Sequence, residues 1–199
     1  MSKVTVFMTA GAMVALVSGV QAAARQRETP AVPAQTIAGQ MDKTSKTIDK
    51  SLLADRDEDF VKHAAQSSKV ELDASKLAST RAFNAEVRAF AEKLITDHTA
   101  ASEHLKSFAL VKNVALNDDD PDLKTKMTKH ESLQTLTGAE FDKEYLEDMI
   151  SDHENSIVLY ANQALKGKDA AIKAWAEKTM PGLRDHLKMA RDLRAKLFK

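Results

Sequence analysis

The chain has 199 residues, with 29 Lys and Arg against 29 Asp and Glu, 43% hydrophobic residues and no cysteine. This composition is typical of one ordinary globular domain, and a net charge of zero gives no basic excess for binding nucleic acid. Without cysteine there is no disulfide, no catalytic thiol, no thiolate metal site and no lipid on an N-terminal cysteine. Any metal site must therefore use histidine and carboxylate ligands.

The first 22 residues have the features of a secretory signal peptide. Lys3 precedes a short apolar run over residues 4–17, and small residues lead to Ala22. This run is shorter than the ~20 residues that a membrane-spanning helix needs, and no later stretch approaches that length. We predict cleavage after Ala22, a periplasmic or secreted location, and no transmembrane segment in the mature form. An uncleaved N-terminal anchor is the alternative.

Composition changes twice after the predicted signal peptide. Residues 23–54 are rich in Pro, Gln, Thr, Ala and Lys, with few large apolar side chains. Such a segment cannot bury enough surface to offset its ordering entropy, so we predict a flexible tether. Residues 55–199 carry long apolar-periodic stretches with few glycines and prolines, which predicts an all-helical domain.

The first two long helices are predicted from their end signals. One covers residues 57–79 and opens with acidic residues, which favour the positive N-terminus of a helix. The next begins after Asn84, a good N-cap, and ends near Asn113. In the connection that follows, Asp120 and Pro121 form an N-cap and N1 pair for a short helix over residues 122–136, whose length suits a crossover.

Two more long helices complete the domain. Residues 137–140 fit a capping box that opens a helix ending at Gly167, and the last helix covers residues 169–197. Four long helices with a short fifth in the second connection predict an all-α, ferritin-like four-helix bundle with one long crossover.

Three of the six histidines interrupt apolar stripes on separate helices. His98, His153 and His186 have apolar or small neighbours at helical spacing, so their imidazoles point into the bundle. The first helix contributes Glu71 on one stripe, while Val70 belongs to a competing, slightly rotated face. All four polar residues lie near the middle of their helices, so the predicted topology brings them to one level.

These four residues are the predicted metal ligands. Three imidazoles and one carboxylate cannot satisfy one another when buried, whereas a divalent cation solves that problem. The donor set matches tetrahedral zinc and also suits iron or copper, with Glu71 either ligating or leaving a water position open. In the alternative interpretation the inward histidines are hydrogen-bonded core residues. We predict that His63, His104 and His130 are surface residues.

An aspartate precedes each inward histidine, and it either orients the imidazole of a neighbouring helix or is a solvated flank. These aspartates are Asp97, Asp152 and Asp185.

Other chemistries fit the pattern less well. A di-iron ferritin site needs Glu three residues before His, but those positions hold Ile95, Ile150 and Leu183, so no di-iron centre is expected. Met149 shares a stripe with His153 and would crowd a haem. Nucleotide-binding glycine loops and Ser/His/Asp signatures are absent. A metal ion with an open coordination position could support hydrolysis. No dedicated base is evident in the sequence, so we predict no catalytic residue.

Several residues carry a family resemblance over residues 60–193. They are Phe60, Glu71, Leu77, Ala78, Phe90, Ala91, Asp97, His98, Gly138, Phe141, Asp142, Tyr145, His153, Pro181, His186 and Leu187. In order and spacing they resemble the exported bacterial proteins grouped as domain-of-unknown-function family 4142. The resemblance implies an exported protein of ferritin-like fold and supplies no activity. Asp73 stands where that pattern has glycine, which puts the packing of the first helix in question.

Two classes of function follow from these observations. The first is an exported metal-binding bundle that holds, buffers or senses one divalent ion, with a role in envelope stress. The second is a non-catalytic structural or interaction module that engages a protein partner or a second copy of itself.

Overall fold

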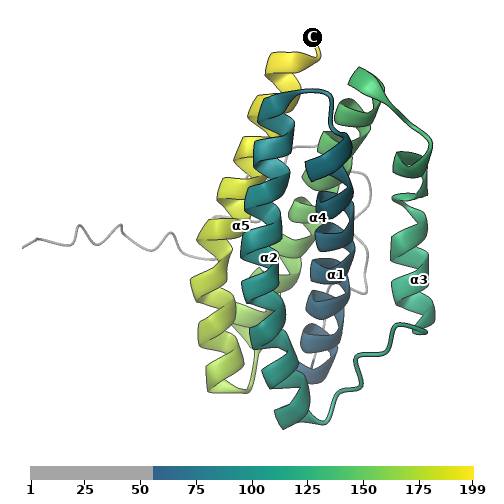
Figure 1. Ribbon diagram of the computed structural model, residues 1–199. Helices are drawn as coiled ribbons and strands as arrows, with labels where there is room; N and C mark the ends of the chain where they lie inside the picture. The colour runs from purple at the N-terminus through teal and green to yellow at the C-terminus, as the bar shows by residue number, and fades with distance from the viewer. Residues whose placement is uncertain (1–55) are drawn as a thin grey trace, which may run out of the picture. The chain divides into compact units, whose positions relative to one another are not determined.

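The computed structural model describes residues 56–199, and the predicted signal peptide (1–22) and tether (23–54) lie outside the described residues. The described part is all-α (Figure 1). Its long helices are α1 (Asp57–Arg81), α2 (Ala85–Lys112), α4 (Gly138–Lys166) and α5 (Ala170–Leu197).

The helices form two antiparallel pairs joined by a long crossover. α1 packs along α2, and α4 packs along α5, while α1 also contacts α4. The crossover carries α3 (Pro121–Thr128) and the 3-10 helix η3 (Glu131–Gln134) along the outside of α1, back to the end where α4 begins (Figure 1). The seam between α2 and α5 has the sparsest contacts of the four long-helix seams. This arrangement confirms the predicted ferritin-like bundle.

Most predicted helix ends are confirmed. The side chain of Asn84 accepts a hydrogen bond from the amide of Glu86 at 2.7 Å, and Asn113 ends α2 in the left-handed region with φ 55°. Asp120 caps α3 ahead of Pro121, and the side chain of Asp169 accepts from two amides at the start of α5. Each of these caps satisfies backbone groups that the helix itself leaves unpaired.

Two predicted details are wrong. The helix expected over residues 122–136 ends at Thr128 and continues only as η3. The capping box is absent, since Thr137 makes no side-chain cap and the positive φ of Gly138 (62°) separates Thr137 from the helical backbone. The prediction that Gly167 ends α4 is confirmed. Its backbone is extended (φ −54°, ψ 142°), and glycine is required there for close approach, because a Cβ would lie 2.5 Å from the Gln163 carbonyl oxygen.

Asp73, which departs from the resembled pattern, is accommodated without a break in α1. Its carboxylate is half-exposed and forms ion pairs with Lys69 and Lys76, each at 3.6 Å. The aspartate thus lies among cations on the outer face of the helix.

Two buried aspartates join the helix ends. At one end of the bundle, Asp57 accepts hydrogen bonds from the Gln163 side chain (2.7 Å) and from the amides of Lys168 and Asp169 (3.1 and 2.9 Å). At the other end, Asp142 of α4 accepts from the amides of residues 83 and 84 at 2.8 and 2.7 Å. Each carboxylate holds a turn of one helix pair against the other pair.

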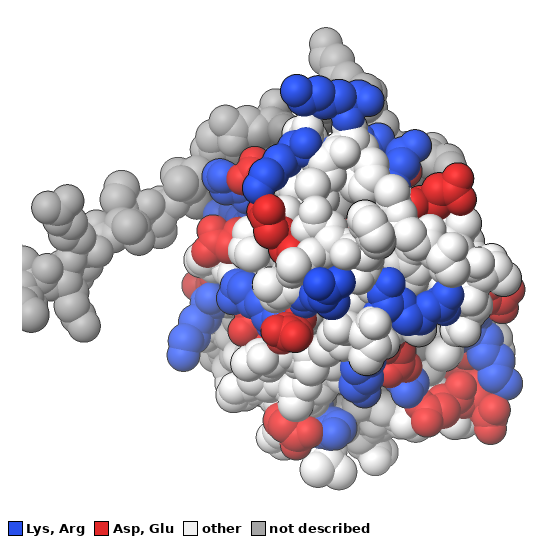
Figure 2. Space-filling model, turned by 45° about the horizontal axis from the view of Figure 1, so that its top comes forward, with Lys and Arg blue, Asp and Glu red and all other residues white. Residues whose placement is uncertain are grey.

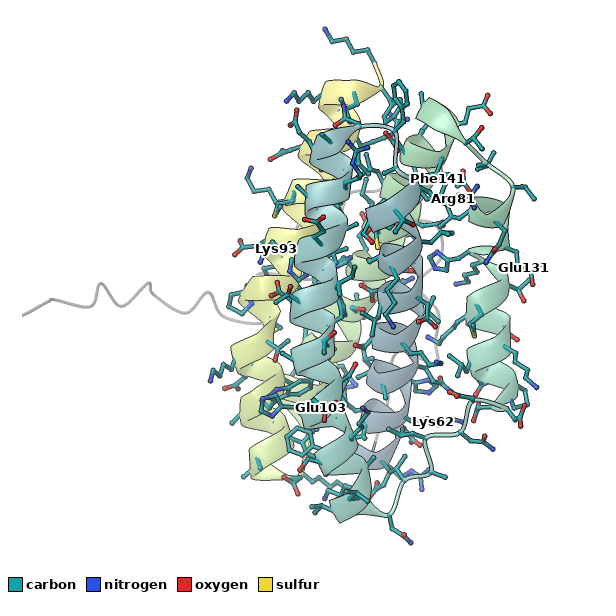
Figure 3. All side chains as sticks on the ribbon, viewed as in Figure 1. Lys62, Arg81, Lys93, Glu103, Glu131 and Phe141 are labelled. Atoms are coloured by element: carbon teal, nitrogen blue, oxygen red, sulfur yellow. The ribbon has the colours of Figure 1, made fainter. Side chains whose placement is uncertain are left out.

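Arg81 holds the last part of the crossover, just before α4, against the bundle. Its guanidinium donates to the carbonyls of Leu133, Gln134 and Leu136, at 3.3, 3.0 and 2.9 Å. It also lies over the ring of Phe141, 5.5 Å from the centroid, and Figure 3 shows the two residues together. The last turn of α1 therefore fixes both η3 and the start of α4.

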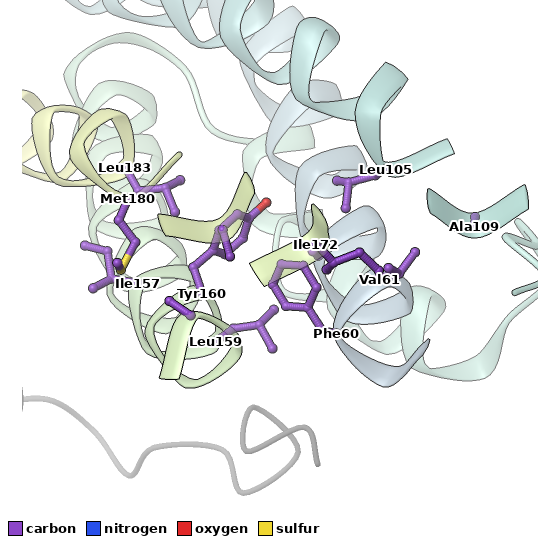
Figure 4. Close-up of a cluster of buried hydrophobic side chains, with 13 residues drawn as sticks. Phe60, Val61, Leu105, Ala109, Ile157, Leu159, Tyr160, Ile172, Met180 and Leu183 are labelled. Atoms are coloured by element: carbon purple, nitrogen blue, oxygen red, sulfur yellow. The ribbon is translucent and has the colours of Figure 1, made fainter. Parts of the chain in front are cut away.

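The apolar core forms two clusters along the bundle. One surrounds Phe60 and Tyr160, whose rings meet edge to face at 5.0 Å (Figure 4). The other surrounds Phe90, Phe141 and Tyr145. On every long helix the residues of the first cluster are separated from those of the second by a short interval. A layer of the bundle between the two clusters is therefore left for polar side chains.

The surface mixes charges of both signs. On the face drawn in Figure 2, Lys and Arg alternate with Asp and Glu and neither sign gathers into a large patch. None of the helices between residues 56 and 199 is both long enough and apolar enough to span a membrane.

Candidate metal centre

The polar layer between the two apolar clusters contains Glu71, His98, His153 and His186, one from each long helix. Their exposed fractions are 1%, 5%, 0% and 4%. On each helix the residue falls in the interval between the clusters, so the two apolar clusters enclose the layer from both sides. The helical stripes predicted this convergence, including the inward position of Glu71.

The side-chain donors of these residues lie close together. Glu71 Oε2 lies 3.3 Å from His98 Nε2 and 3.4 Å from His153 Nε2. His153 Nε2 lies 3.2 Å from His186 Nδ1. The three histidines offer nitrogens that all lie within 4.8 Å of one another. Four electron-pair donors thus share one small volume.

Hydrogen bonds on the outer side of each ring fix which nitrogen carries the proton. His153 Nδ1 lies 2.8 Å from the Met149 carbonyl, which can only accept, so this nitrogen carries hydrogen. His186 Nε2 lies 2.7 Å from Asp97 Oδ2 and donates to that carboxylate. In the neutral rings, His153 Nε2 and His186 Nδ1 then carry lone pairs that face each other.

His98 follows the same rule. The Ser68 oxygen lies 3.3 Å from the His98 carbonyl oxygen, 3.1 Å from Ser102 Oγ and 3.4 Å from His98 Nδ1. When the Ser68 hydroxyl donates to the carbonyl, Nδ1 is the donor to Ser68. The inner nitrogen, Nε2, then carries a lone pair, and this atom is buried with no hydrogen bond among the described residues. Glu71 Oε2 is buried without a hydrogen-bond partner in the same part of the chain.

The shared environment opposes charge on every member. Burial and the neighbouring histidines lower the pKa of His98 to about 3, and burial and His186 lower the pKa of His153 to about 4. Burial lowers the pKa of His186 despite its hydrogen bond to Asp97. Burial, reinforced by Asp152, raises the pKa of Glu71 well above its ordinary value. With Glu71 protonated, one carboxyl proton would serve three nitrogen lone pairs.

The three aspartates that precede the inward histidines differ in role. Asp97 contacts His186 of the neighbouring helix, as one of the two predicted alternatives requires. Asp152 contacts His130 instead, at 2.9 Å, and Asp185 is exposed on α5. Burial raises the pKa of Asp97, but hydrogen bonds from Lys93 and His186 outweigh burial and lower it, so the carboxylate stays ionised beside His186.

The prediction that His130 is a surface residue is wrong. Its side chain is 9% exposed, and its ring lies between Asp148, 3.0 Å from Nδ1, and Asp152, 2.9 Å from Nε2. Its position in the crossover, before η3, gave no helical periodicity from which burial could be read. His63 is half-buried and His104 is exposed.

Sequence reasoning also missed two hydroxyls of the polar layer. Ser68 holds His98, as described, and Ser156 donates to Glu71 Oε1 at 3.3 Å. Both serines are buried. Serine is common on solvent-facing positions of helices, so only the helical spacing that brings Ser156 near His153 could have indicated its role.

Comparison with a solved structure supports the fold. The chain resembles a crystal structure from Streptomyces coelicolor, described as "putative secreted protein DUF305", with a TM-score of 0.61 and 17% sequence identity. The match covers 72% of this chain and 95% of that chain. At this identity the likeness concerns the helical fold alone. No curated protein matches the chain.

Comparison with family models gives the family itself. The model for a domain of unknown function, DUF4142, matches residues 40–193, which confirms the resemblance drawn from the sequence. That range includes all four residues of the polar layer. The chain therefore belongs to the DUF4142 family.

Proposed function

We propose that this protein binds one divalent metal ion within the helical bundle, with Glu71, His98, His153 and His186 as ligands. The observation that carries the proposal is the convergence of four buried lone-pair donors with too few protons to satisfy them. An unsatisfied buried polar group costs about 1–3 kcal/mol. A cation bound among the four donors would relieve all of them at once.

The spacing of the donors supports this assignment. Ligands bound at about 2.0–2.2 Å around a tetrahedral zinc ion lie about 3.3 Å from one another. The contacts among Glu71, His98, His153 and His186 measure 3.2, 3.3 and 3.4 Å. Imidazole and carboxylate ligands also suit iron and copper, so the donor set favours a transition metal or zinc over calcium or magnesium.

The outer hydrogen bonds have the form expected around metal-binding histidines. A ligating imidazole commonly donates its other N–H to a carboxylate, a carbonyl or water, which fixes the ring. Here the acceptors are Asp97 for His186, the Met149 carbonyl for His153 and the Ser68 hydroxyl for His98. We assign the protein to metal holding, buffering or sensing outside the cytoplasm, in keeping with its signal-like first 22 residues, and we keep envelope stress as the physiological setting of this proposal.

Metal content tests the proposal directly. The full chain would be produced through the export pathway without a His tag, and its metals measured by mass spectrometry. We expect near-stoichiometric metal in the wild type, and loss of metal in the His98→Ala/His153→Ala double variant. His104→Ala is the matched control, because this histidine is exposed on the same helix as His98. A wild-type protein that is metal-free and also rejects added zinc, iron and copper would leave the histidines as hydrogen-bonded core residues.

Two further measurements separate ligation from folding. Glu71→Gln keeps the size and neutrality of the protonated side chain, so we expect it to fold normally and to bind metal more weakly. A chelator should lower the Tm of the metal-loaded wild type by about 10 °C if the free metal had stood a thousandfold above Kd. The same chelator should leave the Tm of the double variant unchanged.

A further inference from the structure

A cavity of about 240 Å³ lies beside the proposed metal centre. Three of the four proposed ligands border it, namely Glu71, His98 and His186. The cavity is also bordered by Lys178 and Gly182 of α5, both of which are exposed. It therefore connects the protein surface with the inner face of the ligand cluster.

The cavity exists because the seam between α2 and α5 is loosely filled. Ala101 of α2 and Gly182 of α5 border it, and neither residue has a side chain long enough to close it. A Cβ added to Gly182 would find no atom within 4 Å, so the space beside this glycine is empty. By contrast, His153 is fully buried and does not border the cavity. The opening is confined to one side of the centre.

The polar groups along the cavity favour a negatively charged occupant. Lys178 contributes an ammonium group at its outer part and forms no ion pair among residues 56–199. Tyr160 also borders the cavity. Burial and the nearby Glu71 raise the pKa of Tyr160, so the hydroxyl stays a neutral donor. The carboxylate of Asp97 is offset by Lys93, 2.7 Å away on α2, at the position labelled in Figure 3.

We propose that the metal ion keeps one coordination position directed into this cavity, and that a small anion binds there. The proposal rests on the proposed function. A divalent ion with one carboxylate and three neutral imidazoles has a net positive charge, which an anion would balance. Zinc-type sites with protein ligands on one side accept a further ligand on the open side, with expansion to five-coordination. The volume admits inorganic anions and short carboxylates.

Cobalt substitution provides the test, because the visible spectrum of Co²⁺ reports coordination number. Azide would be titrated into the Co²⁺-loaded full chain, and we expect a saturable spectral change. Gly182→Leu should weaken azide binding by about tenfold or more, because a bulky side chain at this position on the border of the cavity would obstruct it. Gly182→Ala is the matched control and should bind azide like the wild type. Lys178→Ala should weaken azide binding by about threefold through loss of an exposed charge.

The outcomes separate the two proposals. Cobalt that binds in wild-type protein with a spectrum unaffected by azide would overturn the open position and leave the metal site standing. Equal azide affinity in wild type and in a folded, cobalt-loaded Gly182→Leu variant would overturn the cavity as the place of binding. Failure of the wild-type chain to bind cobalt, zinc, iron or copper would overturn the proposed function and this inference with it. The wild-type titration decides the matter even if Gly182→Leu does not fold.

Discussion

Two histidine environments in this bundle place the same side chain in opposite charge states. In the polar layer, burial and neighbouring imidazoles lower the pKa of His98 to about 3 and that of His153 to about 4. In the crossover, burial also lowers the pKa of His130, but hydrogen bonds and charges from Asp148 and Asp152 outweigh it and raise the pKa to about 10.

The difference lies in the ratio of carboxylates to imidazoles. His130 has two carboxylates to itself, so the imidazolium is neutralised and acts as a structural cation. The polar layer has three imidazoles for one internal carboxyl, Glu71, which burial makes hard to ionise. A buried site short of negative charge keeps its histidines neutral, and neutral imidazole is the form that binds metals. The comparison gives His130 a structural role and supports the metal-binding role proposed for the polar layer.

The largest effect expected from this comparison concerns His130 and pH. Its pKa rises from an ordinary value of 6.5 to about 10 in the folded state. The native state therefore holds this proton more tightly than the unfolded chain, so its contribution is complete below about pH 6.5 and is lost as the pH rises towards 10. We expect about 3 kcal/mol of the wild-type free energy of unfolding to disappear across this window, after allowance for partial exposure.

Urea unfolding at several pH values would measure this loss, with His130→Gln as the variant and His104→Gln as the exposed control. The stability difference between wild type and His130→Gln should shrink as the pH rises, and the exposed His104 provides the control for a His→Gln change as such. A wild-type curve parallel to that of His130→Gln from pH 6 to 10 would show that the two aspartates do not hold an imidazolium.

A smaller effect, on metal binding, is expected for a change at Asp97. This carboxylate contacts His186, so one histidine of the polar layer has a carboxylate partner, as His130 has in the crossover. Asp97→Asn removes the negative charge that orients His186 and should weaken metal binding by about 10–100-fold. Competition with a chelating indicator would measure the change. Asp185→Asn is the matched control, since Asp185 precedes the same histidine but is exposed. Equal losses in both variants would argue that Asp97 acts only through general surface charge.

The smallest effect is expected at Ser156, whose hydroxyl donates to Glu71 at 3.3 Å. Ser156→Ala should destabilise the metal-free protein by about 1 kcal/mol, as for loss of one hydrogen bond to a neutral group. Chemical unfolding beside Ser151→Ala, an exposed serine of the same helix, would measure it. A loss of several kcal/mol would instead mean that Glu71 is ionised without metal, which would break the contrast between the two clusters.

The four-helix architecture could be predicted from sequence because each long helix has a strong apolar period and clear end signals. The helix N-termini lie where capping residues predicted them, at Asn84, Asp120 and Asp169. The crossover was harder, since residues 122–136 have helix-forming composition but lie on the outside of the bundle, where tertiary contacts decide how far a helix continues. Gly138 likewise has a local conformation that the capping-box pattern does not reveal.

The polar layer could be predicted for a related reason. A histidine in an apolar stripe is visible in the sequence, and its position along the bundle follows from its distance to the helix ends. The convergence of Glu71 with His98, His153 and His186 could therefore be predicted. The hydrogen-bond partners that determine the protonation of the histidines could not be predicted from the sequence. Asp148 and His130 meet only because the crossover folds against α4, and helical periodicity carries no information about that contact. Whether the layer binds metal depends on protonation and occupancy, which sequence patterns do not encode.

The hydrogen bonds of Asp57 have a mechanical consequence. The carboxylate at the first residue of α1 is bonded to the turn between α4 and α5, which lies more than a hundred residues further along the chain. A pull on the chain ahead of Arg56 would therefore act on the turn between α4 and α5 as well as on α1, so that both helix pairs would share the load.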